Sequence, residues 1–333
     1  MELHYFLTTN GSQGHYSFLK KETESLRNNV RLDGYPRSVA SALIRECYAI
    51  AKQSKMSMHV IHNCLDNSTE AILFPDLSAS LINVPVYEQR FDVASLFHNE
   101  QLKKYEHHIN NAFRHFSDGK VIHDEWEKIY ISSLDFQKLN AFGESFASDV
   151  LPQQKSKHPG TLTDRFFGSA TINGSLDYIE CLTENTKRYL IKGRPGTGKS
   201  TFMKSIAQKA FDLGYHIERY HCSFDPNSLD MIVIRELSIS IFDATAPHEY
   251  FPTKSDDEIL DLYALSTVRD VDSDYKNELS EYASKYKQSI GNAIKSIIAA
   301  NDACTIAEDD YRRQIDDNRL MDVRKMIIEK IFP

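Results

Sequence analysis

The sequence predicts an α/β fold made of two similar halves, each a three-layer sandwich with a mainly parallel sheet followed by a helical hairpin. Three observations predict it: an internal repeat, a glycine-rich loop between an apolar strand and an amphipathic helix, and helical apolar spacing at the end of each copy. The 333 residues, 41% hydrophobic and 26% charged, match an ordinary globular protein of about two domains.

The repeat appears when the chain is aligned with itself at a spacing of 159 residues, as between Gly34 and Gly193. The same spacing superposes, in order, Pro36 on Pro195, Ser41 on Ser200, His62 on His221 and Asp66 on Asp225. After one inserted residue, Pro226, the segment 76–83 matches 236–243. An ordered series of matches indicates a duplicated unit.

Apolar residues recur at helical spacing from Phe97 to Leu139 and from Leu279 to Ile331, which predicts a helical hairpin in each copy. The polar, proline-bounded stretch between them indicates a linker over residues 151–160. We therefore expect a first domain over 1–150 and a second over 161–333, packed together as an intramolecular pseudo-dimer.

The second copy contains a phosphate-binding loop, or P-loop, of the pattern G-x-x-x-x-G-K-[ST]. Its residues, with the following threonine as part of the polar lining, are Gly193, Arg194, Pro195, Gly196, Thr197, Gly198, Lys199, Ser200 and Thr201. A short apolar strand over 188–191 precedes the loop, and an amphipathic helix over 201–211 follows it. Glycines let backbone N–H groups surround a β-phosphate at the positive end of a helix, Lys199 faces the β- and γ-phosphates, and Ser200 can ligate Mg²⁺. The loop predicts binding of a nucleoside triphosphate with magnesium.

Asp243 ends an apolar stretch, 237–242, that reads as a buried strand beside the loop strand. A carboxylate there can hold Mg²⁺ directly or through water, as a Walker B residue does. The alternative is that Asp243 only caps the turn before Ala244. Asp225, Asp230 and Glu236 are the candidates for orienting the attacking group, and the sequence leaves the choice among them open.

The first copy lacks these groups. Arg37, Val39 and Ala40 stand where the second copy has Gly196, Gly198 and Lys199, and Asn83 stands where it has Asp243. We expect the first copy to be a degenerate partner that binds no triphosphate. Because His62 and Asp66 match His221 and Asp225, part of the role of those two residues is expected to be structural.

Three further patterns are weaker. His221, Cys222 and His248 lack the spacing of a zinc motif. The segment 253–256, Thr-Lys-Ser-Asp, resembles a guanine-reading motif but follows Asp243 with no further strand expected between, so adenine is the expected base. Arg312 and Arg313 in the last hairpin are candidates for a lid over the phosphates.

The charge and the cysteine content limit the partners and the cellular location that the sequence predicts. The net charge of −8 argues against nucleic acid as a partner. The five cysteines are widely spaced, no basic leader opens the chain, and no apolar run approaches the ~18 residues of a membrane span. We expect a cytoplasmic protein with no membrane contact.

The chain resembles the two-copy P-loop ATPases of mainly Gram-positive bacteria, described as uncharacterised ATPases or nucleotide-kinase-like proteins. The likeness lies in the segments 189–201, 221–230 and 242–250 and extends over essentially the whole chain. It implies tandem P-loop NTPase-like domains and ATP binding, without a settled substrate. Members of that family commonly keep an intact loop in the first copy as well, and residues 32–41 depart from that pattern.

The leading expectation is an Mg²⁺-dependent ATPase in which the second copy binds and hydrolyses ATP beside an inactive first copy. One alternative is a small-molecule or nucleotide kinase that passes the γ-phosphate to an acceptor. The other is a nucleotide-gated binding module with negligible turnover, whose partner is a small molecule or another protein.

Overall fold

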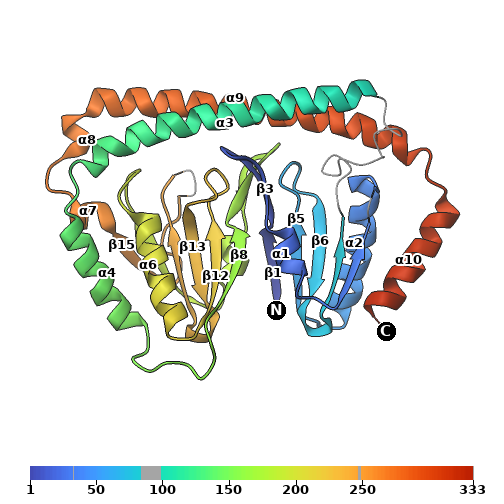
Figure 1. Ribbon diagram of the computed structural model, residues 1–333, viewed down its shortest axis with the longest axis horizontal. Helices are drawn as coiled ribbons and strands as arrows, with labels where there is room; N and C mark the ends of the chain where they lie inside the picture. Colours follow the sequence, from blue (N-terminus) through green and yellow to red (C-terminus); the bar gives the residue numbers. More distant parts are fainter. Residues whose placement is uncertain (33, 84–98, 247–248, 333) are drawn as a thin grey trace.

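The computed structural model describes residues 1–32, 34–83, 99–246 and 249–332, so Asp33, Phe97 and His248 lie outside the described residues. The chain is an α/β protein with one mixed sheet of eleven described strands, over which two long helices lie (Figure 1). The expected α/β class is therefore confirmed, while its arrangement differs from the expectation in two respects given below.

The same succession of elements occurs twice along the chain. The first half contains β1 (Glu2–Phe6), β2 (Thr8–Gly11), β3 (Gly14–Ser17), α1 (Leu19–Thr23), β4 (Asn28–Arg31), α2 (Arg37–Gln53), β5 (Met58–His62), β6 (Thr69–Phe74), a 3-10 turn (Pro75–Leu77), β7 (Ala79–Ile82), α3 (Asn99–Ile131) and α4 (Phe136–Val150). The second half contains β8 (Thr161–Phe166), β9 (Gly168–Thr171), β10 (Gly174–Asp177), α5 (Ile179–Leu182), β11 (Lys187–Lys192), α6 (Lys199–Asp212), β12 (His216–His221), β13 (Leu229–Ile234), a 3-10 turn (Arg235–Leu237), β14 (Ile239–Asp243), β15 (Glu258–Asp261), α7 (Leu262–Ser266), α8 (Val271–Asp274), α9 (Lys276–Arg312) and α10 (Asp317–Ile331).

The sheet is continuous through both halves, in the order β15-β11-β14-β13-β12-β8-β1-β5-β6-β7-β4. β1 and β8 meet at its centre through the pair Phe6–Phe166, and the strand order is mirrored on either side of that pair, with β15 added at one edge. In each half one strand, β6 or β13, runs antiparallel to both neighbours. The expectation of two separate, mainly parallel sheets is wrong, because short turns join β5 to β6 to β7 and β12 to β13 to β14, and such turns allow only antiparallel pairing.

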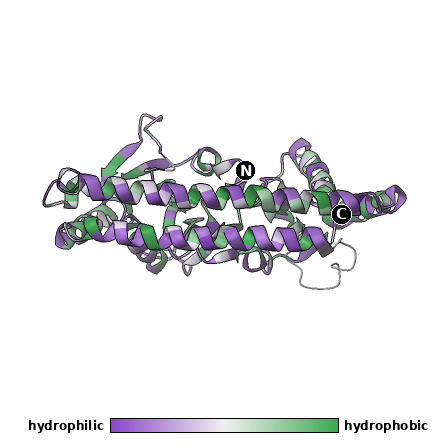
Figure 2. Cartoon of the chain, turned by 90° about the horizontal axis from the view of Figure 1, so that it is seen from above, coloured by the Kyte–Doolittle hydropathy of each residue, from purple (hydrophilic) through white to green (hydrophobic). Residues whose placement is uncertain are grey.

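The helices also differ from the expected hairpins. α3 and α9, one from each half, run antiparallel and side by side along the length of the molecule (Figures 1 and 2). Ala112 and Phe116 of α3 pack with Ala293 and Ile297 of α9 in one buried cluster. α4 packs instead on α6, and α10 packs against β4 and β7. Each long helix therefore extends beyond its own half and lies over the other.

The loop strand β11 is fixed in position by burial on both faces. Tyr189 and Ile191 pack in a cluster with α6 and α4, whereas Leu190 packs in the cluster at the centre of the molecule. Parallel pairing with β14 aligns Ile191 with Asp243. The ends of these two neighbouring strands consequently lie together, and this positions the site described next.

Within the described ranges, no helix has an apolar stretch long enough to cross a bilayer.

Candidate functional site

The loop between β11 and α6 adopts a conformation that depends on its glycines. Gly196 and Gly198 have φ values of 77° and 81°, the left-handed region that side chains disfavour. Gly198 is the residue before α6, and no described side chain caps that helix end. The first backbone N–H groups of α6 are therefore available to an anion.

The predicted ligand residues lie together beside this loop. Lys199 Nζ is 3.5 Å from Asp243 Oδ2 and donates a hydrogen bond of 3.0 Å to the Arg194 carbonyl. Ser200 Oγ accepts a hydrogen bond from Leu229 N at 2.9 Å. Asp243 Oδ1 accepts from Thr245 N and Thr245 Oγ1, so this carboxylate also caps a turn.

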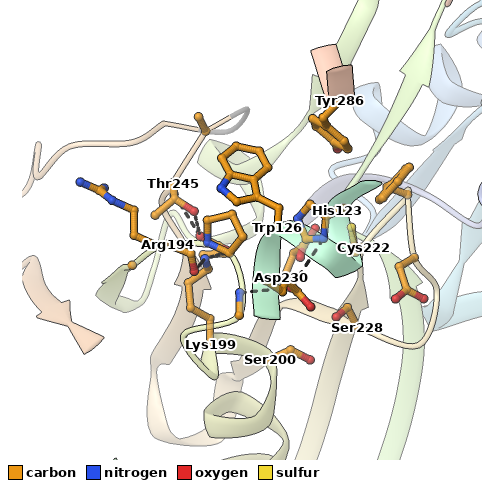
Figure 3. Close-up of a pocket in the computed structure, with 18 of the residues that line it drawn as sticks. His123, Trp126, Arg194, Lys199, Ser200, Cys222, Ser228, Asp230, Thr245 and Tyr286 are labelled. Carbon is orange, nitrogen blue, oxygen red and sulfur yellow. Dashed lines mark hydrogen bonds and ion pairs between the residues drawn. The ribbon is translucent and has the colours of Figure 1, made fainter. Parts of the chain in front are cut away.

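These residues line a cavity of ≈ 1080 Å³, which is also bounded by α3, α9 and the loop between β12 and β13 (Figure 3). All nine residues predicted to bind nucleotide, 193 to 201, line it, as do Asp225, Asp230 and Asp243. In Figure 3 the rings of Trp126 and Tyr286 lie above Lys199 and Ser200. The cavity therefore joins elements of both halves.

α3, which follows the sheet of the first half, closes directly on the loop of the second. Gly196 N donates a hydrogen bond of 3.2 Å to Glu127 Oε1. A Cβ at Gly196 would come within 2.9 Å of the Glu127 carbonyl oxygen and within 3.0 Å of the Ile131 side chain. The Glu127 carboxylate thus accepts the hydrogen bond of a loop amide that could otherwise donate to a phosphate oxygen.

Burial shifts the ionisation of the groups around Glu127. The pKa of Glu127 is raised by burial, which outweighs the opposing charges of Lys120 and Lys199. The pKa of His123, one turn away on α3, is lowered by burial and by Lys120. His123 is therefore a neutral imidazole at pH 7.

Asp225 lines the cavity but already has several partners. Its Oδ1 accepts from Asn227 N at 3.1 Å, and its Oδ2 lies 3.5 Å from Lys120 Nζ. Glu236 lies elsewhere, because its oxygens accept from His216 N at the start of β12. Of the three carboxylates left open by the sequence, Asp225 and Asp230 are thus the two at the cavity.

Several other predicted residues are already held by protein partners. Arg194 lines the cavity but pairs with Asp272 at 2.8 Å. His221 contacts Asp164 at 2.9 Å and the Pro226 carbonyl at 2.6 Å. Lys254 of the guanine-like segment donates to the Thr183 and Glu184 carbonyls before β11 begins, and Arg312 and Arg313 pair with Asp317 and Asp310.

The equivalent region of the first half has a different backbone. α2 begins at Arg37, which corresponds to Gly196, whereas α6 begins at Lys199, three positions later in the alignment. Arg37 and Val39 are helical, whereas Gly196 and Gly198 have the left-handed conformation. The loop of the second half is replaced here by the first turn of a helix.

The Arg37 side chain is buried, with 3% exposed, between acidic residues. Its Nε lies 3.0 Å from Glu308 Oε2, and its NH1 lies 2.7 Å from Asp66 Oδ2. Arg37 N also donates to Glu308 Oε1 at 3.1 Å. Glu308 of α9 thus corresponds to Glu127 of α3, because each accepts from the amide at the same position of the repeat.

Sequence reasoning missed the contribution of α3 and α9 to the site. The residues concerned are Lys120, His123, Trp126, Glu127 and Tyr286. Trp126 and Tyr286 belong to the apolar helical sets and are interpreted as packing residues, whereas Lys120, His123 and Glu127 are not singled out by that spacing. A signal was present in the density of polar and aromatic residues between 120 and 127, which an ordinary packing stripe does not need.

Comparison of the chain with protein-family models, with curated proteins and with solved structures finds no match in any of the three. The family resemblance therefore stays a prediction from the sequence.

Proposed function

We propose that the protein is a P-loop NTPase that binds one ATP with magnesium in its second half and hydrolyses it. The observation that supports this most directly is the loop 193–200, with left-handed Gly196 and Gly198 and an uncapped α6 beneath Lys199. In this proposal the two halves are tandem P-loop NTPase-like units, the first of them degenerate.

The donor set of the site suits a magnesium ion. Ser200 and Asp243 offer hydroxyl and carboxylate oxygens, the ligands that this hard cation prefers, and both line the cavity. When bound, the ion would neutralise charge on the β- and γ-phosphates. Lys199, 3.5 Å from Asp243, would exchange that carboxylate for the phosphates.

Hydrolysis requires a group that orients water near the γ-phosphate. Asp225 and Asp230 are the candidates, since both line the cavity beside the loop. Both lie on the side of the loop where β14, β13 and β12 follow β11 in the sheet. The proposed metal ligand Asp243 lies on the same side.

Isothermal titration of the full chain with a non-hydrolysable ATP analogue and Mg²⁺ tests the proposal. We expect a stoichiometry near one and no binding after Lys199→Ala. Binding of two analogues, or binding that survives the substitution, would contradict the assignment to the second half. Tight binding with no phosphate release from ATP would favour a nucleotide-gated binding module over an ATPase.

A further inference from the structure

The cavity extends well beyond the loop, into a part that we name the inner chamber and define by five rings. They are contributed by α3, α9 and the loop after β12: Phe116, His123, Trp126, Phe224 and Tyr286. Centroids of neighbouring rings are 5.5 to 6.3 Å apart, as for His123 with Tyr286 and Phe116 with Phe224. These separations are typical of interacting aromatic side chains.

The inner chamber lies on the side of the loop where a γ-phosphate would point. β14, which carries Asp243, is next to the loop strand β11, and β13, β12 and β8 follow toward the centre of the sheet. Lys199 and a metal ligand at Asp243 act on the β- and γ-phosphates, so the γ end of the nucleotide faces β14. Asn10 and Ala170, from the hairpins at the centre, line the far end of the same cavity.

The cavity is at the upper end of the size of small-ligand pockets, about 300–1,000 Å³, with ≈ 1080 Å³. Besides the loop residues 193–201, its lining includes Asn10 and Ala170 from the hairpins at the centre of the sheet. The base and ribose of ATP would extend from the loop in the opposite direction, away from β14. The inner chamber is therefore left for a second ligand.

The lining of the inner chamber selects the chemistry of that ligand. Aromatic walls favour a planar ring, which stacks on them. Trp126 Nε1 is buried and has no hydrogen-bond partner among the described residues, so an acceptor atom of a ligand that reaches it would satisfy it.

We propose that the inner chamber binds a phosphoryl acceptor that carries a hydroxyl group on a planar heteroaromatic ring compound. The proposal rests on the proposed ATP site, and the acceptor hydroxyl takes the place of the water in the proposed hydrolysis. The hydroxyl oxygen attacks the γ-phosphorus and forms a new P–O bond, while the bond from the γ-phosphorus to the bridging oxygen breaks and ADP leaves with the electron pair. The hydroxyl proton passes to the Asp230 carboxylate, which lines the cavity beside His123.

Trp126 is the single tryptophan of the chain and lines the cavity, so the change in its fluorescence on adding a probe is measured with the ATP site already saturated. The full chain is incubated with Mg²⁺ and ATP labelled on the γ-phosphate, together with cytidine or pyridoxine as probe. Cyclohexylmethanol, which has a hydroxyl group but no aromatic ring, is the control. We expect at least one heteroaromatic alcohol to change Trp126 emission and to acquire the label, and the control to do neither.

Two variants separate a binding role from a packing role. Tyr286→Leu should weaken binding of the accepted probe about tenfold, the effect of removing one stacking partner. Tyr105→Leu is the matched control, because Tyr105 occupies the equivalent position on α3, at the spacing that relates Glu127 to Glu308, and does not line this cavity.

The outcomes that oppose the proposal are distinct. If neither probe changes Trp126 emission or acquires the label while the ATP analogue binds, the inner chamber binds no acceptor of this class. The proposed ATP site is then retained. If the unmodified chain binds no ATP analogue, the proposed function itself fails. If Tyr105→Leu weakens the probe as much as Tyr286→Leu does, the effect is a general loss of helix packing and the site is not in the inner chamber.

Discussion

In each half, a glutamate of a long helix accepts a hydrogen bond from the backbone amide at the same position of the repeat. The two halves differ in what surrounds that glutamate. In the second half, Glu127 accepts from Gly196 N and faces an open cavity. In the first, Glu308 accepts from Arg37 N and is also held by the Arg37 guanidinium, itself nearly fully buried. A side chain of the protein thus fills the first site, while the second is left open to a ligand. Arg37 in place of Gly196 accounts for the filled space, and Arg37, Val39 and Ala40 together account for the lost loop.

The largest expected effect concerns the loop of the second half, which the first half lacks. Lys199→Ala removes the cation that faces the β- and γ-phosphates, so we expect ATP turnover to fall by about a hundredfold or more. Lys209→Ala, on the same helix but paired with Glu144 at the surface, is the control and should retain turnover. Phosphate release in a steady-state assay is the measurement. Turnover that is equal in the two variants would move the active site away from the loop.

The next effect concerns stability. Arg37→Ala leaves Glu308 and Asp66 without their buried cation, and removing one member of a buried ion pair costs about 3–5 kcal/mol. Arg194→Ala breaks the pair with Asp272, which is about half exposed, and should cost under about 1 kcal/mol. Urea unfolding of both variants measures the difference. Equal losses would show that Arg37 contributes no more than a surface ion pair.

A third prediction exchanges the residues at the ends of β7 and β14. Asp243→Asn should lower Mg²⁺-dependent turnover by about tenfold or more and change affinity for the ATP analogue little, if Asp243 holds the metal. Asn83→Asp should instead destabilise the first half. Asn83 is buried, with 1% exposed, and its Oδ1 has no hydrogen-bond partner among the described residues, so a carboxylate there would be a buried charge with the same lack of partners at that oxygen. A magnesium titration of Asp243→Asn that matches the parent would show that Asp243 only caps the turn at Thr245.

The comparison also shows which parts of the molecule the sequence could predict. The loop, its strand and its helix follow from short-range signals, namely glycines at left-handed positions and apolar residues on β11 and α6. The pairing of Ile191 with Asp243 agrees with the prediction of a buried strand beside the loop strand. The loop, its strand and its helix depend on neighbours along the chain, and the pairing with β14 could be predicted because a separate apolar run ends at Asp243.

The arrangement of the halves depends on contacts far apart in sequence, and the sequence alone did not predict it. The joining of the sheets at Phe6–Phe166 leaves no periodic pattern of its own. The apolar stripe of α3 is equally satisfied by α4 in a hairpin or by α9 across the molecule, and burial of Ala112 and Phe116 against α9 decides between them. Because α3 and α9 line the cavity, the sequence could not place Glu127, Trp126 and Tyr286 beside the loop without knowing that these two helices pair.

The smallest expected effect tests whether Glu127 competes with phosphate for the loop. A net hydrogen bond contributes about 0.5–1.5 kcal/mol, so Glu127→Ala, which frees Gly196 N, should raise affinity for the ATP analogue by roughly twofold to tenfold. Glu127→Gln keeps an oxygen at that amide but removes its charge, and it should give a smaller rise because a neutral acceptor binds the amide less strongly. Glu308→Gln is the matched change in the first half: it should lower stability through Arg37 and leave nucleotide affinity unchanged. Isothermal titration of the three variants decides the point, since weaker binding by Glu127→Ala would mean that Glu127 contributes to the nucleotide site instead of occupying it.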